Sequence, residues 1–156
     1  MPTKFNFEEV NKMLSRYKRE TLVLLANQAQ NYFLGSFKKQ GWNGSQWPEV
    51  QRRTPGTKAY KYPKTKGLQR RTQPILIGSG YKKRGGTLRR AVSSMERTAQ
   101  ISSDRVRMLV DLPYAEVINE GGKHMPERRF IGQTEQLTKM QKDKITEIVN
   151  KIWQTK

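Results

Sequence analysis

The chain has 156 residues, no cysteine, and 31 Lys and Arg against 13 Asp and Glu, a formal net charge of +18. This length suits a single domain over residues 1–156, and the lack of cysteine excludes disulfide frameworks and thiolate metal sites. The hydrophobic fraction of 34% and the mean hydropathy of −0.89 predict a small core. No apolar run is long enough to cross a bilayer, and the first ten residues show no export signal.

The positive charge is concentrated in one region of the chain. From Lys38 to Arg90 there are 15 basic residues and one acid, Glu49, whereas the rest of the chain has 16 basic and 12 acidic residues. A segment with a net charge of +14 attracts polyanions, either nucleic acid or an acidic protein surface. The alternative interpretation is a solubilising, partly disordered insertion.

Residues 7–39 are predicted to form one long helix. Asn6 is the expected N-cap, acidic residues follow it in the first turn, and Gly41 is the expected stop. Side chains at spacings of 3 and 4 share one face of this helix, which we expect to pack on a sheet, another helix or a neighbouring subunit. They are Phe7, Val10, Leu14, Tyr17, Thr21, Leu24, Leu25, Gln28 and Tyr32.

Residues 41–74 show no sustained period and are rich in Pro, Gly and aromatic residues, so they are predicted to be a basic loop or disordered arm. Trp42 and Trp47 are expected to anchor its start on the core. Its basic residues, interleaved with Tyr60 and Tyr62, are suited to stacking on bases and gripping phosphates, or to a solvated tether. The candidate DNA or partner contacts are Arg52, Arg53, Lys58, Lys61, Lys64, Lys66, Arg70 and Arg71.

Residues 75–112 are predicted to be the sheet region. We expect a strand over Ala91–Ile101 and a second strand over Asp104–Leu112, where Val106, Met108 and Val110 alternate with other residues. Residues 102–104 are the expected hairpin turn between them.

Residues 113–132 are predicted to connect this sheet to the last helix. Residues 114–120 suit a short helix that ends at Gly121-Gly122. Residues 133–154 carry an apolar face typical of a second long helix, with Thr134 as its candidate N-cap. The predicted fold is therefore α+β, with long N- and C-terminal helices packed on a small antiparallel sheet and a basic extended arm.

The chain shows no pattern typical of an enzyme. His124 is the only histidine, and no metal-ligand spacing, nucleophile motif or phosphate-binding glycine loop accompanies it. We expect His124 to be a surface turn residue, its neighbouring glutamates to be solvated or paired with Lys123, Arg128 or Arg129, and the protein to use no cofactor.

Several segments, in order along the chain, resemble the phage virion morphogenesis family, the tail-completion or neck proteins of Mu-like tailed phages. The matching segments are Gly44–Trp47, Leu76–Gly80, Leu88–Ala91, Tyr114–Gly122 (YAEVINEGG) and Met125–Gly132 (MPERRFIG). The chain departs from the family pattern by an apparent insertion at 81–86, by Glu127 and Arg129 in place of Ala and Pro, and by Ile118 where His is common.

The resemblance implies a non-enzymatic structural protein that forms rings, commonly hexameric, at the end of the tail in the virion neck. Such a protein is made in the bacterial cytoplasm, from a phage or prophage genome. Its partners would be copies of itself, tail-tube or terminator proteins, head–tail connector proteins and the genomic DNA in the channel. The residues expected at its assembly contacts are Tyr114, Arg128, Arg129 and Phe130, with Phe130 buried either in the core or in a subunit contact.

Two other functions remain open at this point. Charge alone suggests a general, non-enzymatic nucleic-acid-binding protein. A tail-tube terminator, rather than a completion protein on the head side, is the third.

Overall fold

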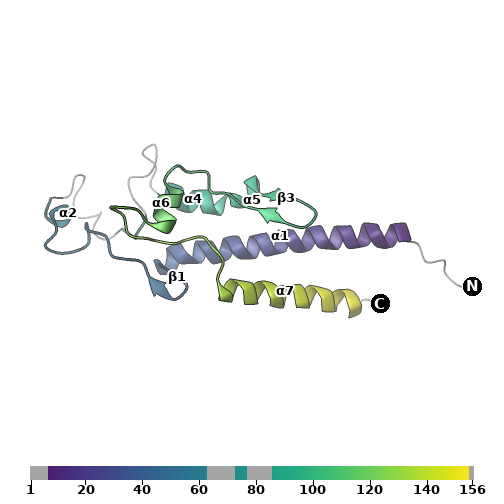
Figure 1. The fold of residues 1–156 in the computed structure, drawn as a ribbon. Helices are drawn as coiled ribbons and strands as arrows, with labels where there is room; N and C mark the ends of the chain where they lie inside the picture. The colour runs from purple at the N-terminus through teal and green to yellow at the C-terminus, as the bar shows by residue number, and fades with distance from the viewer. Residues whose placement is uncertain (1–6, 63–72, 77–85, 155–156) are drawn as a thin grey trace, which may run out of the picture. The chain divides into compact units, whose positions relative to one another are not determined.

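The computed structural model describes residues 7–62, 73–76 and 86–154 (Figure 1). Helices and small antiparallel sheets alternate along the chain, with a long helix at each end. The predicted α+β class is therefore confirmed.

The chain divides into two compact units. The first consists of Met1–Asn31, Met95–Leu109 and Gln133–Lys156, and we call it the helical unit. The second consists of Tyr32–Ser94 and Val110–Gly132, and we call it the aromatic unit because its core is built from aromatic side chains.

The first helix, α1, spans Phe7–Lys39, close to the predicted bounds. Its predicted N-cap lies outside the described residues. The residue that leaves the helix at its C-terminal end is Gln40, which has a left-handed φ of +50°, so the predicted stop at Gly41 is displaced by one residue.

The buried face of α1 differs from the predicted face. Leu14, Tyr17 and Leu24 are exposed, Leu14 to 55%, whereas Ala26, Ala29, Phe33 and Phe37 are among the buried residues of the helix. Periodicity identifies side chains that share a face, but it does not say which face meets a partner. Aromatic residues far along the chain decide this for the last turns of α1.

Residues 41–46 form a hairpin where the sequence predicted only a loop. Strands β1 (Gly41–Trp42) and β2 (Ser45–Gln46) pair antiparallel. The turn residues Asn43 and Gly44 both have positive φ, +49° and +87°, as a two-residue turn of the hairpin type requires. Asn-Gly is a strong local signal for this turn, and the basic, Pro-rich context had outweighed it.

The predicted strand over Ala91–Ile101 is wrong except at its end. Residues Thr87–Ser93 form helix α4 and Met95–Thr98 form helix α5, because Leu88, Val92 and Met95 are buried at helical spacing. Only Gln100–Ile101 (β3) is a strand, and it pairs antiparallel with Val106–Arg107 (β4).

The hairpin turn predicted at 102–104 is confirmed. The Ser102 N–H donates to the Arg105 carbonyl at 2.9 Å. The second strand is much shorter than the predicted Asp104–Leu112, because paired strand ends at Arg107.

The last two helices are close to their predicted positions. Helix α6 spans Ala115–Glu120 and is followed by Gly121, whose φ is +81°. Helix α7 spans Glu135–Gln154, and the Thr134 hydroxyl accepts a hydrogen bond from the Leu137 N–H at 3.1 Å. This confirms Thr134 as the N-terminal cap.

Within the helical unit, α7 lies beside the first part of α1, with its C-terminal end toward the N-terminal end of α1 (Figure 1). The Gln28 amide of α1 donates to the Met140 carbonyl of α7 at 3.2 Å. Leu137 is buried to 99%, and Met95 is fully buried. Few large side chains in this unit are enclosed to the same extent.

Candidate functional site

The two segments that carry the family resemblance are hydrogen-bonded to each other. The Asn119 side-chain oxygen accepts from the N–H groups of Phe130 at 3.0 Å and Ile131 at 3.1 Å. The Arg128 N–H donates to the Ile118 carbonyl at 2.9 Å. One amide side chain at the end of α6 therefore orders the segment that leads to α7.

Gly121 allows these segments to approach closely. Its φ of +81° lies in a region that L side chains rarely adopt, and a Cβ there would lie 3.0 Å from the Glu127 nitrogen. Gly122 and Met125 then form a β-bridge, so Lys123 and His124 occupy an exposed turn. The prediction that His124 is a surface turn residue is confirmed.

Phe130 is at the centre of the aromatic unit. Only 1% of its surface is exposed, and its ring lies 5.6 Å from that of Phe37 at the end of α1. Trp47 packs edge-on against Phe37 at 5.7 Å and donates its indole N–H to the Arg129 carbonyl at 2.7 Å. Of the two places expected for Phe130, the structure thus selects the core.

Trp42 extends this cluster along α1. Its ring lies 5.6 Å from Tyr32 and 6.1 Å from Phe33. The predicted anchoring of the arm by Trp42 and Trp47 is therefore confirmed.

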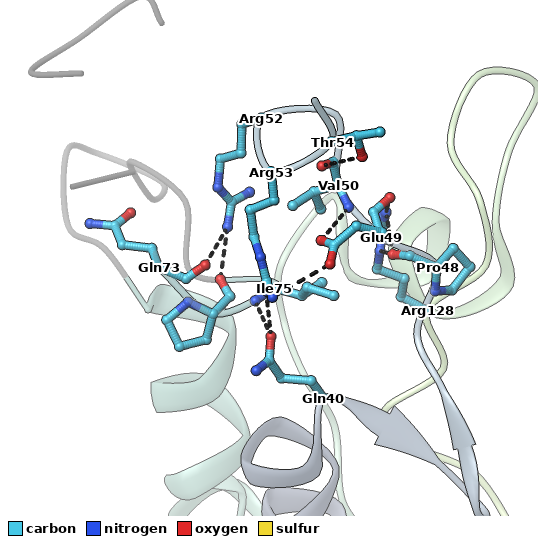
Figure 2. A network of polar contacts seen from close by, with 11 residues as sticks. Gln40, Pro48, Glu49, Val50, Arg52, Arg53, Thr54, Gln73, Ile75 and Arg128 are labelled. Carbon is cyan, nitrogen blue, oxygen red and sulfur yellow. Dashed lines mark hydrogen bonds and ion pairs between the residues drawn. The ribbon is translucent and has the colours of Figure 1, made fainter. Parts of the chain in front are cut away.

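Arg128 holds the start of the arm. Its guanidinium donates to the Pro48 carbonyl from Nε at 3.1 Å and from Nη2 at 3.0 Å, and to the Glu49 carbonyl at 3.4 Å (Figure 2). The residue is only 8% exposed. Burial lowers the pKa of Arg128, and the nearby Glu49 carboxylate partly offsets this.

Arg52 and Arg53, predicted as polyanion contacts, make internal bonds (Figure 2). Arg53 donates to the Gln40 side-chain oxygen at 3.1 Å and lies 3.4 Å from a Glu49 carboxylate oxygen. Arg52 donates to the carbonyls of Gln73 at 3.1 Å and Pro74 at 2.8 Å. Both arginines therefore tie the arm to other parts of the aromatic unit.

Gln40 is the central acceptor of this network. Its side-chain oxygen receives the Arg53 guanidinium and also the Ile75 N–H, at 2.8 Å. Ile75 is buried, so this bond fixes the point at which the chain returns from the arm. No local pattern singles out Gln40, because its role depends on residues 13 and 35 positions away.

The remaining predicted contact residues are differently placed. Lys58 and Lys61 are exposed on α2 (Lys58–Lys61), which is capped by the Thr57 hydroxyl. Tyr114 is half-buried at the start of α6, and the exposed Arg129 forms an ion pair with Glu127 at 3.1 Å. Lys64, Lys66, Arg70, Arg71 and most of the Leu76–Gly80 segment lie outside the described residues.

The helical unit exposes an apolar stripe along α1. Leu14, Tyr17 and Leu24 follow one another at spacings of 3 and 7, which places them on one face, and each is exposed by more than a third. On α7, Met140, Ile145 and Val149 are also exposed. We use the name apolar stripe for Leu14, Tyr17 and Leu24.

Within the described residues, no group of three or more His, Asp or Glu side chains is placed to hold a metal ion. In the same ranges, no helix is long and apolar enough to cross a membrane.

Comparisons of the chain with family models, with curated proteins and with solved structures found no match.

Proposed function

We propose that this protein is a structural virion assembly protein, a ring subunit that completes the phage tail or joins the tail to the head in the neck. The observation that carries the proposal is the apolar stripe of α1, together with the exposed apolar residues of α7. Soluble monomers rarely leave such residues uncovered in one region, and neighbouring subunits would cover them.

The family resemblance adds the type of assembly. Its two most specific segments, Tyr114–Gly122 and Met125–Gly132, are held together through Asn119 and enclose Phe130. Residues that maintain a rigid connector in this way suit a subunit that must present the same surface to each neighbour. In a ring the contact is heterologous and closes by rotation.

The arm suits contact with a partner through its exposed lysines. Since Arg52 and Arg53 bond within the aromatic unit, the exposed Lys58 and Lys61 are the arm residues of the described range that we propose to meet DNA or a neighbouring subunit. Such contacts would be salt-sensitive and independent of DNA sequence. The protein would then act in the virion neck, after synthesis in the host cytoplasm.

The second candidate is a general nucleic-acid-binding protein, favoured by the net charge of +14 between Lys38 and Arg90. It predicts a monomer or dimer that binds DNA at moderate salt. The ring subunit predicts a defined larger oligomer and weak, salt-sensitive DNA binding at most.

Size-exclusion chromatography with light scattering, followed by negative-stain imaging alone and with phage tails, separates the two. Rings that bind the tail end support the proposal. A monomer or dimer that binds DNA at moderate salt and never associates with tails contradicts it.

The role of the arm is tested by reversing its exposed charges. Lys58→Glu with Lys61→Glu should preserve folding but weaken ring formation or head–tail joining, whereas deletion of 50–72 also removes Arg52 and Arg53 and with them the internal bonds. If neither variant affects assembly, the arm has no role in it.

A further inference from the structure

The chain continues the strand pattern of β4 beyond its last paired residue. Val106, Met108, Val110 and Leu112 are half-buried, whereas Arg107, Leu109 and Asp111 are exposed. This strict alternation is that of a strand with one covered face, yet ladder pairing ends at Arg107. We call residues 106–111 the open edge.

The hydrogen-bonding direction of the open edge follows from the hairpin. Gln100 pairs with Arg107, and Ser102 donates to Arg105, so odd-numbered residues of β4 direct their N–H and C=O groups toward β3. Even-numbered residues direct theirs away from it. Throughout the ranges that the structure describes, no main-chain hydrogen bond involves Met108.

A turn marks the end of this edge. The Leu112 N–H donates to the Val110 carbonyl at 3.0 Å, a two-residue turn common at strand ends, and Pro113 follows. The edge is thus short, as protected edges are, but its outward groups remain available.

We propose that the open edge pairs with the open edge of a second copy of this chain, antiparallel about a two-fold axis at Leu109. In this register Met108 lies opposite Val110 of the second copy, and both are even-numbered residues that direct their main-chain groups outward. Each such pair exchanges two main-chain hydrogen bonds, and the two-fold axis doubles the set.

Charge complementarity identifies the second copy as the occupant. With Leu109 on the axis, Arg107 lies opposite Asp111 of the second copy, and Asp111 lies opposite its Arg107. Both are exposed on the same face and occupy pairs without main-chain bonds, where facing side chains are closest. A shift by two residues would place Arg107 opposite Leu109 or Pro113 instead.

The apolar residues agree with this register. Leu109, which is 47% exposed, meets its own counterpart on the axis, and the half-buried side chains of Met108 and Val110 face each other on the opposite face. A contact between identical surfaces produces pairs rather than rings. The inference therefore concerns a different contact from the proposed ring and does not depend on it.

Cysteine cross-linking tests the register directly, because the chain has no cysteine of its own. Leu109→Cys should form a covalent dimer under mild oxidation, since the two side chains face each other at the axis at about disulfide distance. Ser103→Cys, at the exposed hairpin turn of the same unit, is the matched control and should cross-link about tenfold more slowly or less. Equal rates would overturn the proposal.

Charge reversal provides a second, independent test by sedimentation velocity. Arg107→Asp and Asp111→Arg each place like charges opposite each other twice, so each should weaken dimerisation about tenfold or more. A mixture of the two variants restores opposite charges in the mixed dimer and should favour it. Arg105→Asp makes the same charge change outside the register and should leave dimerisation unchanged.

Each outcome of the mixing experiment decides the proposal, provided that circular dichroism shows both variants folded. Preferential mixed dimers support it. Undiminished self-association of either single variant, or mixed dimers at no more than the statistical fraction, would overturn it. Ring formation is scored separately by imaging, so loss of the pair contact and loss of the proposed function are distinguishable.

Discussion

The two units of this molecule handle their apolar surface in opposite ways. Among the described residues, three large apolar side chains are exposed in the aromatic unit and nine in the helical unit. The aromatic unit encloses Phe33, Phe37, Trp47 and Phe130 in one core. The helical unit instead has its two long helices side by side with much of their apolar surface in contact with water.

The difference separates stability from association. A closed aromatic core supplies free energy of folding, because buried area is removed from water within one chain. Exposed apolar residues supply free energy only when a neighbour covers them. We therefore expect substitutions in the aromatic unit to affect folding, and those on the apolar stripe to affect assembly.

Phe130→Ala should have the largest effect. Removing a fully enclosed ring between Phe37 and the connector leaves a cavity, and we expect a loss of about 3–5 kcal/mol in the free energy of unfolding. Urea denaturation measures it. His124→Ala, at the exposed turn, is the control and should change stability little; the reverse pattern would contradict the assignment of the core.

Asn119→Ala should come next. It leaves the N–H groups of Phe130 and Ile131 without their acceptor, at a cost of about 2–3 kcal/mol. Asn119→Asp retains an acceptor oxygen and should recover most of the loss. Equal destabilisation by both variants would show that the side-chain oxygen is not what matters.

Leu14→Ser combined with Leu24→Ser should leave the free energy of unfolding within about 0.5 kcal/mol, since both side chains are already exposed. Oligomer formation, measured by light scattering, should fall. Val23→Ser removes a similarly exposed side chain that is not on the apolar stripe, and should not affect the oligomer. A stable oligomer in the double variant would show that this stripe is not an assembly surface.

The smallest effect concerns Glu147 on α7. Hydrogen bonds from Lys144 and Lys151, each 2.7 Å long, lower the pKa of its carboxyl from 4.5 to about 2. Since the folded pKa lies below the unfolded one, the ion pairs stabilise α7 above about pH 4.5 and are lost as the pH falls toward 2. The carboxylate is fully exposed, so solvent screens this contribution strongly.

An NMR titration of the Glu147 carboxyl checks this prediction. Lys144→Ala should raise the pKa toward 4.5, whereas Lys139→Ala should leave it unchanged. An unchanged pKa in Lys144→Ala would show that the ion pair does not persist in solution.

The long helices and the connector were predictable because their signals are local. Thr134 caps α7, Gly121 ends α6, and residues 102–104 turn the hairpin, each through residues within a few positions. The segment 91–101 was assigned to a strand because it is short and apolar, a case in which helix and strand are hard to distinguish. The burial of Leu88, Val92 and Met95 at helical spacing corrects it.

By itself, the sequence determined the α+β class, the bounds of both long helices, the concentration of charge and the anchoring of the arm by two tryptophans. Only the tertiary structure decided which face of α1 is covered, and that Arg52, Arg53 and Arg128 bond to carbonyls and amides far along the chain. The physical reason is the same in both cases. Capping and turn formation act within a few residues, whereas burial and arginine pairing depend on which distant segments meet.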